Sequence, residues 1–347
     1  MRTLTLRLAA LLLAACDADT TSPADSTTQS DPSHAHGDGG AHDGAVHVGE
    51  HTPTGDYADP SKPFSPPPPK EGYMRIVAPT AKGLAPGSNS THCQYIHAAF
   101  DRDLDVLDVT GYQSSGGHHA VAYAIKNAEP VGTNRPCLDQ DNLVDGFIGG
   151  VGGEASGGVE LPPNVAFRLP KGSAIQLNAH YINTTDQDID GDAVIDFKFA
   201  EVTGDRTIAS LFNNGRTDFM LPANTPSDVT AECVMPKELH FILFANHMHD
   251  HGASAKTELV HADGRVELVH EDLTWRPEMA YKAVYSKWSV ETPLVMKPGD
   301  MLRTRCSWNN SGASALTFPG EMCFGTGFYL SDGSSSPVCL GGRWIER

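Results

Sequence analysis

Two groups of three residues have the composition of transition-metal sites. They are the pair His118-His119 with His180, and His247-x-His249 with Met322. Imidazole binds many metals, whereas a thioether is a soft ligand that suits Cu(I) and is poor for zinc, calcium or magnesium. Met322 therefore favours copper in the second group, and copper favours redox or oxygen chemistry.

The second group depends on a predicted strand that runs from Leu239 to His249. Alternate residues of a strand share a face, so His247 and His249 can reach one metal ion without distortion. Met322 is distant in sequence, and most methionines simply fill a core. A disulfide at the adjacent Cys323 would fix the sulfur, which favours a ligand role.

The first group requires an irregular backbone. Gly116-Gly117-His118-His119 opens an apolar strand, where adjacent side chains point to opposite faces. Both histidines can bind one metal only if the chain turns there, which paired glycines permit. His180 lies in another predicted strand, and its spacing alone favours an ordinary core or surface histidine.

The elements that carry these residues are predicted to be strands. Short runs rich in Val, Ile, Phe, Tyr and Thr alternate with turn residues from about residue 71 onwards, without long helical periodicity. Examples are residues 106–109, 120–125, 174–182, 193–199 and 239–245. This pattern predicts an all-β protein of two jelly-roll-like β-sandwiches. A break near 201–205 divides it into domains at 71–203 and 204–347, each with one ligand group.

The first sixteen residues are predicted to be a lipoprotein signal peptide. Arg2 and Arg7 precede an apolar run, which leads into Ala14-Ala15-Cys16. This sequence resembles a bacterial lipobox with Cys16 as the lipidated residue; the alternative is a secretory peptide cleaved after Ala15. We expect export to the periplasm or cell surface, with membrane contact through the lipid anchor only.

Residues 17–70 are predicted to be a disordered tether, because they are polar, contain few large apolar residues and end in Pro66-Pro67-Pro68-Pro69. The tether histidines are His34, His36, His42, His47 and His51. They are interpreted first as part of a solvated linker, with weak copper or zinc capture as the alternative.

Charge and cysteine content restrict the function further. The formal net charge of -18 argues against nucleic acid as a partner, because a phosphate binder needs a basic surface. Without Cys16, six cysteines remain, and an even number in an oxidising compartment predicts three disulfides.

The order His-His, lone His, His-x-His and Glu321-Met322-Cys323 resembles the copper type II ascorbate-dependent monooxygenase family. Cysteines flank His118-His119 much as a family disulfide does, and the resemblance covers most of residues 73–340. It implies two sandwiches facing a solvent-filled cleft, with two coppers per chain.

The resemblance also implies separate roles for the two groups. The first would hold an electron-transfer copper. His247, His249 and Met322 would hold the catalytic copper that binds O₂ and substrate. The implied disulfides are Cys93–Cys137, Cys306–Cys323 and Cys233–Cys339.

The implied activity is hydroxylation of a C–H bond with O₂ and a reductant such as ascorbate. Peptidylglycine enzymes of the family hold a substrate carboxylate beside these ligands, but this sequence has Ala245, Phe324 and Gly325 at the corresponding positions. A peptide ending in glycine is therefore a poor candidate substrate, and another small or peptide-like molecule is expected. The alternative is a non-enzymatic lipoprotein that buffers or delivers copper.

Overall fold

The computed structural model describes residues 61–138, 141, 145–152, 159–280, 282–333 and 336–346. Gly49–Arg347 forms one compact unit, and the other unit, Met1–Val48, lies outside the described residues. The predicted signal peptide, Cys16 and the tether histidines also lie outside them. Within the described residues, every regular element is a strand except the 3-10 helix η2 (Pro277–Ala280), which confirms the all-β fold class. No helix in these ranges is long and apolar enough to span a membrane.

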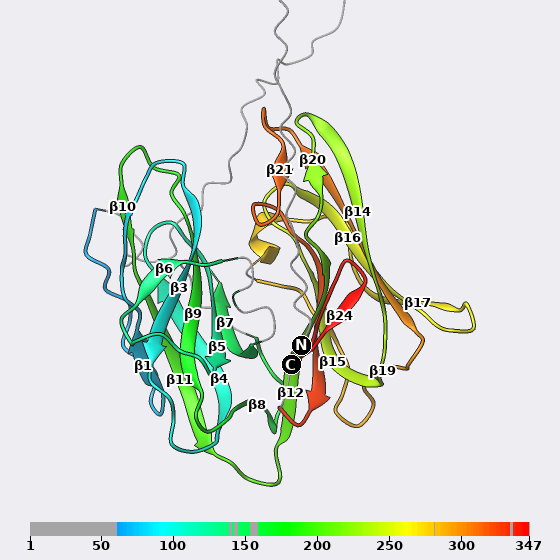
Figure 1. The fold of residues 1–347 in the computed structure, drawn as a ribbon, viewed down its shortest axis with the longest axis horizontal. Coiled ribbons are helices and arrows are strands. Elements are labelled where there is room, and N and C mark those ends of the chain that lie inside the picture. The colour runs from blue at the N-terminus through cyan, green and yellow to red at the C-terminus, as the bar shows by residue number, and fades with distance from the viewer. Residues whose placement is uncertain are drawn as a thin grey trace, which may run out of the picture. The chain divides into compact units, whose positions relative to one another are not determined.

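The N-terminal half is built from two sheet layers (Figure 1). One layer has the order β6 (Asn134–Pro136), β3 (Asn89–His97), β9 (Ala174–Ile182), β5 (Gly117–Ile125) and β7 (Gly146–Gly152). The other has the order β1 (Met74–Val77), β11 (Ala193–Glu201), β4 (Leu104–Gln113) and β8 (Val165–Leu169). A short pair, β2 (Ala81–Leu84) with β10 (Ile189–Gly191), completes this half.

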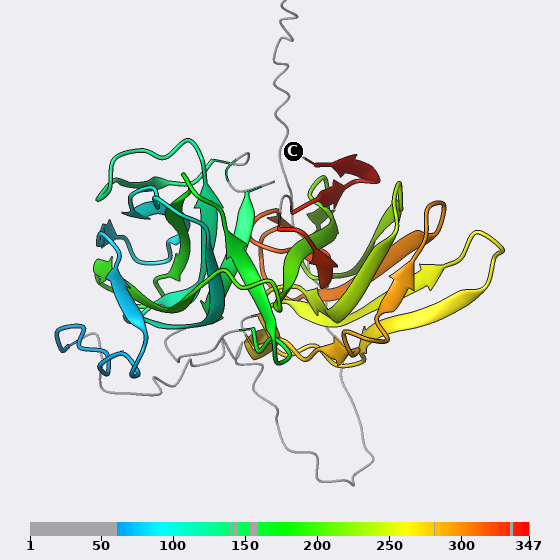
Figure 2. The same cartoon turned by 90° about the horizontal axis from the view of Figure 1, so that it is seen from below.

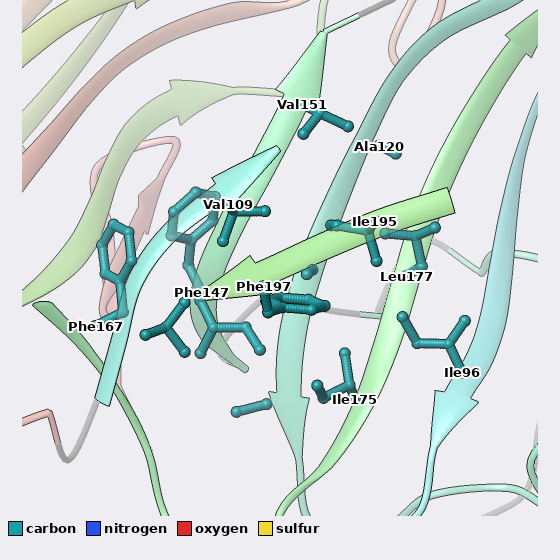
Figure 3. Close-up of a cluster of buried hydrophobic side chains, with 14 of the residues drawn as sticks. Ile96, Val109, Ala120, Phe147, Val151, Phe167, Ile175, Leu177, Ile195 and Phe197 are labelled. Carbon is teal, nitrogen blue, oxygen red and sulfur yellow. The ribbon is translucent and has the colours of Figure 1, made fainter. Parts of the chain in front are cut away.

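Strand alternation gives this half its core. Ile195 and Phe197 are two positions apart in β11, so both side chains leave the same face of the sheet. They pack with Leu177 of β9 and with other buried residues of both layers (Figure 3). Burying one such large apolar side chain contributes about 1.5–3 kcal/mol. The cluster therefore fixes the two layers against each other.

The C-terminal half is a second sandwich. Its first layer contains β12 (Thr207–Arg216), β22 (Cys323–Ser331), β15 (Leu239–His247) and β18 (Ser286–Lys287), with β19 (Leu294–Met296), β23 (Val338–Leu340) and β24 (Arg343–Ile345) attached. The second has the order β14 (Thr225–Val234), β20 (Met301–Asn310), β16 (Gly252–Val260) and β17 (Val266–Asp272). A separate pair is β13 (Met220–Leu221) with β21 (Leu316–Thr317).

The two sandwiches share a sheet and part of a core. β8 and β12 pair in parallel through Thr207 opposite Val165 and Ile208 opposite Ala166, which makes one eleven-stranded sheet (Figures 1 and 2). Phe328 of β22 packs against Phe147 of β7, with ring centroids 5.4 Å apart. The predicted break near residues 201–205 overlaps the loop between β11 and β12. The domain limits 71–203 and 204–347 stay a prediction.

The predicted strands all lie within observed ones, namely β4, β5, β9, β11 and β15. One end differs from the expectation. β15 stops at His247, so the predicted strand does not continue to His249. His249 is held by contacts of its own.

Candidate metal centre

The first group of ligands, His118, His119 and His180, comes together in the structure. Each offers a ring nitrogen, and these nitrogens lie within 4.8 Å of one another. The His118 and His180 side chains are buried, and the ring centroids of His118 and His119 are 4.9 Å and 4.9 Å from that of His180. Three imidazoles converging at this spacing can hold one transition-metal ion.

A β-bulge brings the adjacent histidines together. Gly117 pairs with Tyr181 and His119 with His180, so β5 gains a residue between these two pairs. An extra residue disrupts the alternation of faces, which allows neighbouring side chains to converge. Gly116 precedes the bulge at φ 80°, and a Cβ there would lie 2.9 Å from the Ile182 carbonyl oxygen. The backbone turn that the sequence requires is therefore present.

Hydrogen bonds select the ligand atom of His180. Its Nε2 donates to Oδ1 of Asn89 at 2.6 Å, which leaves Nδ1 for a metal. Nδ1 of His118 and Nδ1 of His119 are 3.0 Å apart. Two nitrogens on one ion with bonds of about 2.0 Å are roughly 3 Å apart. Sequence reasoning missed Asn89 as a partner of His180, since it lies far from His180 in the chain and outside the ligand motifs.

The second group is held in place by the segment just before β22, which lies far along the chain from His247 and His249. Nδ1 of His249 donates to the carbonyl of Gly320 at 3.0 Å. Nε2 of His249 is buried and has no hydrogen-bond partner among the described atoms, which fits a nitrogen that binds a metal. The imidazole of His247 bonds the backbone of Ala280.

Gly252 makes room for the turn that follows His249. A Cβ on Gly252 would lie 2.5 Å from Cδ1 of Trp275. The Trp275 indole donates to the carbonyl of His249 at 2.8 Å. The indole therefore fixes the backbone of a ligand, and only glycine leaves space for it.

Glu321 joins the two parts of the second group. Its fully buried carboxylate accepts hydrogen bonds from the His249 amide at 3.1 Å, the His251 amide at 2.8 Å and Nε1 of Trp308 at 2.9 Å. Burial raises the pKa of Glu321 to about 7, although the three donors act in the opposite direction. His251 contributes its backbone to this network.

Met322 is partly buried and lies between residues that contact the His-x-His segment. Gly320 and Glu321 bond His249, while Phe324 pairs with His247 across β22 and β15. Cys323, next to Met322, forms a disulfide with Cys306. The segment that carries the thioether is therefore anchored on both sides.

The cysteines join as Cys93–Cys137, Cys233–Cys339 and Cys306–Cys323, the pairs that the resemblance implies. Asp141 lies close to the first of these disulfides. Because both sulfurs there are oxidised, they offer no thiolate to a metal.

The two groups lie together, which differs from the implied solvent-filled cleft. The ring of His249 is 5.5 Å from that of His118 and 5.8 Å from that of His180, centroid to centroid. The rings of His119 and His247 are 6.3 Å apart. The shared sheet and the contact between Phe328 and Phe147 join the two sandwiches.

Burial keeps the metal-free histidines neutral. It lowers the pKa of His180 and of His247 to about 3, and neighbouring imidazoles add to the effect. The pKa values of His119 and His249 are also lowered, again chiefly by burial. A neutral imidazole has the lone pair that a metal needs, so the donor set fits copper at neutral pH.

Two apolar residues, Ala245 and Phe324, lie close in sequence to the ligands of the second group. Ala245 is buried in β15. Phe324 lies against Gly215, and its ring centroid is 6.4 Å from that of Phe318. Neither Ala245 nor Phe324 offers a charged group to a substrate.

Comparisons with known proteins give one family match, in the C-terminal half. The family "Copper type II ascorbate-dependent monooxygenase, C-terminal domain" matches residues 209–339. A search of curated proteins gave no match. Solved structures with some similarity include peptide N-glycanase F (8% identity, TM-score 0.34, covering 80% of this chain and 99% of that one). Another is VP54 of PBCV-1 (8% identity, TM-score 0.24, covering 79% and 98%).

The matched residues contain His247, His249 and Met322 together with Glu321. Residues 209–339 thus match the C-terminal domain of the copper type II ascorbate-dependent monooxygenase family.

Proposed function

We propose that the protein is a copper-dependent monooxygenase that hydroxylates a C–H bond of a small or peptide-like substrate. The reaction converts C–H and O₂ into C–OH and water, and takes two electrons and two protons from ascorbate or a similar reductant. The observation that carries the proposal is the attachment of His249 to the Gly320–Glu321–Met322 segment within the family match.

The chain would hold two coppers in distinct coordination. His118, His119 and His180 offer nitrogen only, and we assign them the electron-transfer copper. The second group adds the Met322 sulfur, which favours Cu(I), the oxidation state that reacts with O₂. Bound copper supplies the redox chemistry and the O₂ site.

The protein's own part is to present neutral, oriented ligands. Asn89 orients His180, and the Gly320 carbonyl orients His249, so each ring directs a lone pair inward. Burial keeps these rings unprotonated. Neither needs to lose a proton before it can bind a metal.

The substrate class follows from the apolar residues beside the second group. Ala245 and Phe324 provide no partner for a carboxylate, and burying an unpaired charge is costly. A neutral C–H substrate is therefore favoured over a peptide that ends in a free glycine carboxylate.

We further propose that the protein is exported and held in the cell envelope by lipid on Cys16. The sequence of residues 1–16 supports this proposal. Mass spectrometry of the mature N-terminus would test it, since a diacylglyceryl group on Cys16 is expected.

The activity is tested with the full chain after replacement of the five tether histidines by serine. The expected result is two coppers per chain and O₂ consumption that is coupled to hydroxylated product in the presence of ascorbate. Copper binding with no coupled product from any candidate substrate would favour the alternative, a copper buffering or delivery protein.

Met322→Ile provides the sharper comparison. It removes the sulfur with little change in volume, so turnover should be lost while the first group still binds its copper. Met220→Ile is the matched control, because Met220 is 65% exposed. Unchanged turnover in Met322→Ile would refute the assigned ligand.

A further inference from the structure

A groove lies between two edge strands of the C-terminal sandwich. β17 ends the strand order of one sheet and β18 ends that of the other, and β17 is at the outer side of the half in Figure 1. The groove has a volume of about 600 Å³. Its lining includes His270 of β17 and Ser286 of β18, together with Leu268, Val284, Tyr285 and Trp288. The fold thus brings a histidine and a serine together in an open groove.

The serine and the histidine are in direct contact. Nδ1 of His270 lies 2.9 Å from Oγ of Ser286. The Ser286 side chain is half-buried, whereas His270 is only 6% exposed. A serine hydroxyl becomes an effective nucleophile when a base within hydrogen-bond reach accepts its proton. The pair has the separation that this activation requires.

Asp272 lies on the other side of the imidazole ring. Its Oδ2 is 3.3 Å from Nε2 of His270, although Nε2 makes no hydrogen bond in this conformation. Such contacts in catalytic sites often tighten only when a substrate binds. Because an ionised carboxylate can only accept, it favours the tautomer with the proton on Nε2. The lone pair of Nδ1 is then available to the Ser286 hydroxyl.

A buried network holds Asp272 in place. Nδ2 of Asn246 donates to Oδ2 of Asp272 at 2.9 Å, and the Thr257 hydroxyl donates to Oδ1 of Asn246 at 2.7 Å. All three residues are buried. A buried hydrogen-bonded network is rigid. The carboxylate therefore has a fixed position beside His270, as the supporting member of a nucleophilic serine site must have.

We propose that Ser286, His270 and Asp272 form an acyl-transfer site that hydrolyses esters without the use of copper. Oγ of Ser286 attacks the ester carbonyl carbon while its proton passes to Nδ1 of His270. The bond from that carbon to the leaving alcohol breaks, and the alcohol takes the proton. Water then releases the acyl group as a carboxylic acid by the same steps and restores the serine. Asp272 stabilises the imidazolium in both stages.

The groove indicates the class of ester. Leu268 is 55% exposed and Val284 is 52% exposed, so apolar surface is available there to an acyl chain. Lys287 also lines the groove, and a cation there favours the negative charge that develops on the carbonyl oxygen. The substrate class is an uncharged ester with an apolar acyl chain.

An alkyl fluorophosphonate tests the site, because it phosphonylates an activated serine with loss of fluoride. The full chain is treated with a chelator, reacted with the probe, digested and analysed by mass spectrometry. We expect a phosphonyl adduct on Ser286. Ser286→Ala should lose this adduct, and His270→Gln should slow its formation by about 10²–10⁴-fold. The exposed Ser289→Ala is the control and should react like the unmodified chain.

Hydrolysis of p-nitrophenyl butyrate by the same chain measures the role of Asp272. Asp272→Asn removes the charge beside His270 and leaves the groove walls unchanged. It should therefore lower kcat about tenfold or more, with KM close to that of the unmodified chain. A purely structural role would not separate kcat from KM in this way.

Two results would overturn the ester-hydrolysing site. One is the absence of any adduct on Ser286 in the unmodified, folded chain. The other is an equal rate of adduct formation in His270→Gln. Both are measured without copper, so they leave the monooxygenase proposal intact, and a failure of copper-dependent turnover leaves the ester site intact. An unchanged kcat in Asp272→Asn would overturn the role assigned to Asp272.

Discussion

At the scale of single residues, the atoms that orient the ligands matter as much as the ligands. Asn89 and the Gly320 carbonyl each occupy one nitrogen of a histidine and so direct the other nitrogen inward. Such partners fix the tautomer and the ring orientation, and their loss typically lowers metal affinity about 10–100-fold.

Asn89→Ala should therefore weaken copper binding at the first group by about 10–100-fold. Competition with a copper chelator measures the change, and Asn89→Asp, which keeps an acceptor, should restore much of the affinity. The neighbouring Ser90→Ala is a control for nonspecific effects. Equal affinities for Asn89→Ala and the unmodified chain would contradict the role of Asn89.

The histidine pKa values predict a pH-dependent stability of the metal-free protein. His180 and His247 titrate near 3 when folded and near 6.5 when unfolded. Between these values the unfolded state binds more protons than the folded state. The contribution of these histidines to the free energy of unfolding is therefore greatest above pH 6.5 and decreases as the pH is lowered. The pKa of Glu321 is raised from 4.5 to about 7, so this group makes the folded state more stable as the pH is lowered. It is one group, whereas four histidines have lowered pKa values.

Urea denaturation of chelator-treated protein at pH 7.5 and pH 5.5 tests this prediction. The midpoint should be lower at pH 5.5. His180→Gln should reduce the difference, because one of the protonation sites is removed. A midpoint that does not change with pH would show that the histidines are not buried as neutral groups.

At the scale of elements, a bulge and an anchored loop create the centre. β5 gains a residue beside His118, and the segment before β22 is fixed to the turn after β15 by Glu321. A carboxylate can accept all three hydrogen bonds, whereas an amide cannot, since its NH₂ group is itself a donor.

Glu321→Gln should therefore leave a donor facing a donor, either at Trp308 and His249 or at His251. The expected cost is about 1–3 kcal/mol in the free energy of unfolding. Copper retention at the second group should decrease as well. Thermal unfolding and copper content measure both effects, and the exposed Glu291→Gln is the control.

At the scale of the whole molecule, a shared sheet and a shared core place the two ligand groups together. Phe328 is almost fully buried between the sandwiches, whereas Phe324 in the same strand is only partly buried. Deleting a large buried aromatic side chain usually costs about 3–5 kcal/mol.

Phe328→Ala should lower the free energy of unfolding by about 3–5 kcal/mol. Phe324→Ala should have a smaller effect on stability. Equal losses of stability in the two variants would argue against a special role for Phe328 in joining the halves.

Much of this protein follows from local sequence. Runs rich in Val, Ile, Phe and Tyr between turn residues predicted strands such as 174–182 and 193–199, because β-branched and aromatic side chains favour strands. An even set of six cysteines predicted three disulfides. The soft sulfur of Met322 indicated copper, because ligand preference is a property of the side chain itself.

The arrangement of the centre was decided only by tertiary structure. His118 and His249 are far apart in the chain, and their distance depends on the pairing of β8 with β12 and on the packing of Phe328. The partnership of Asn89 with His180 depends likewise on strand neighbours. Such contacts are set by the register of strands and the shape of a core, which no local pattern of residues encodes.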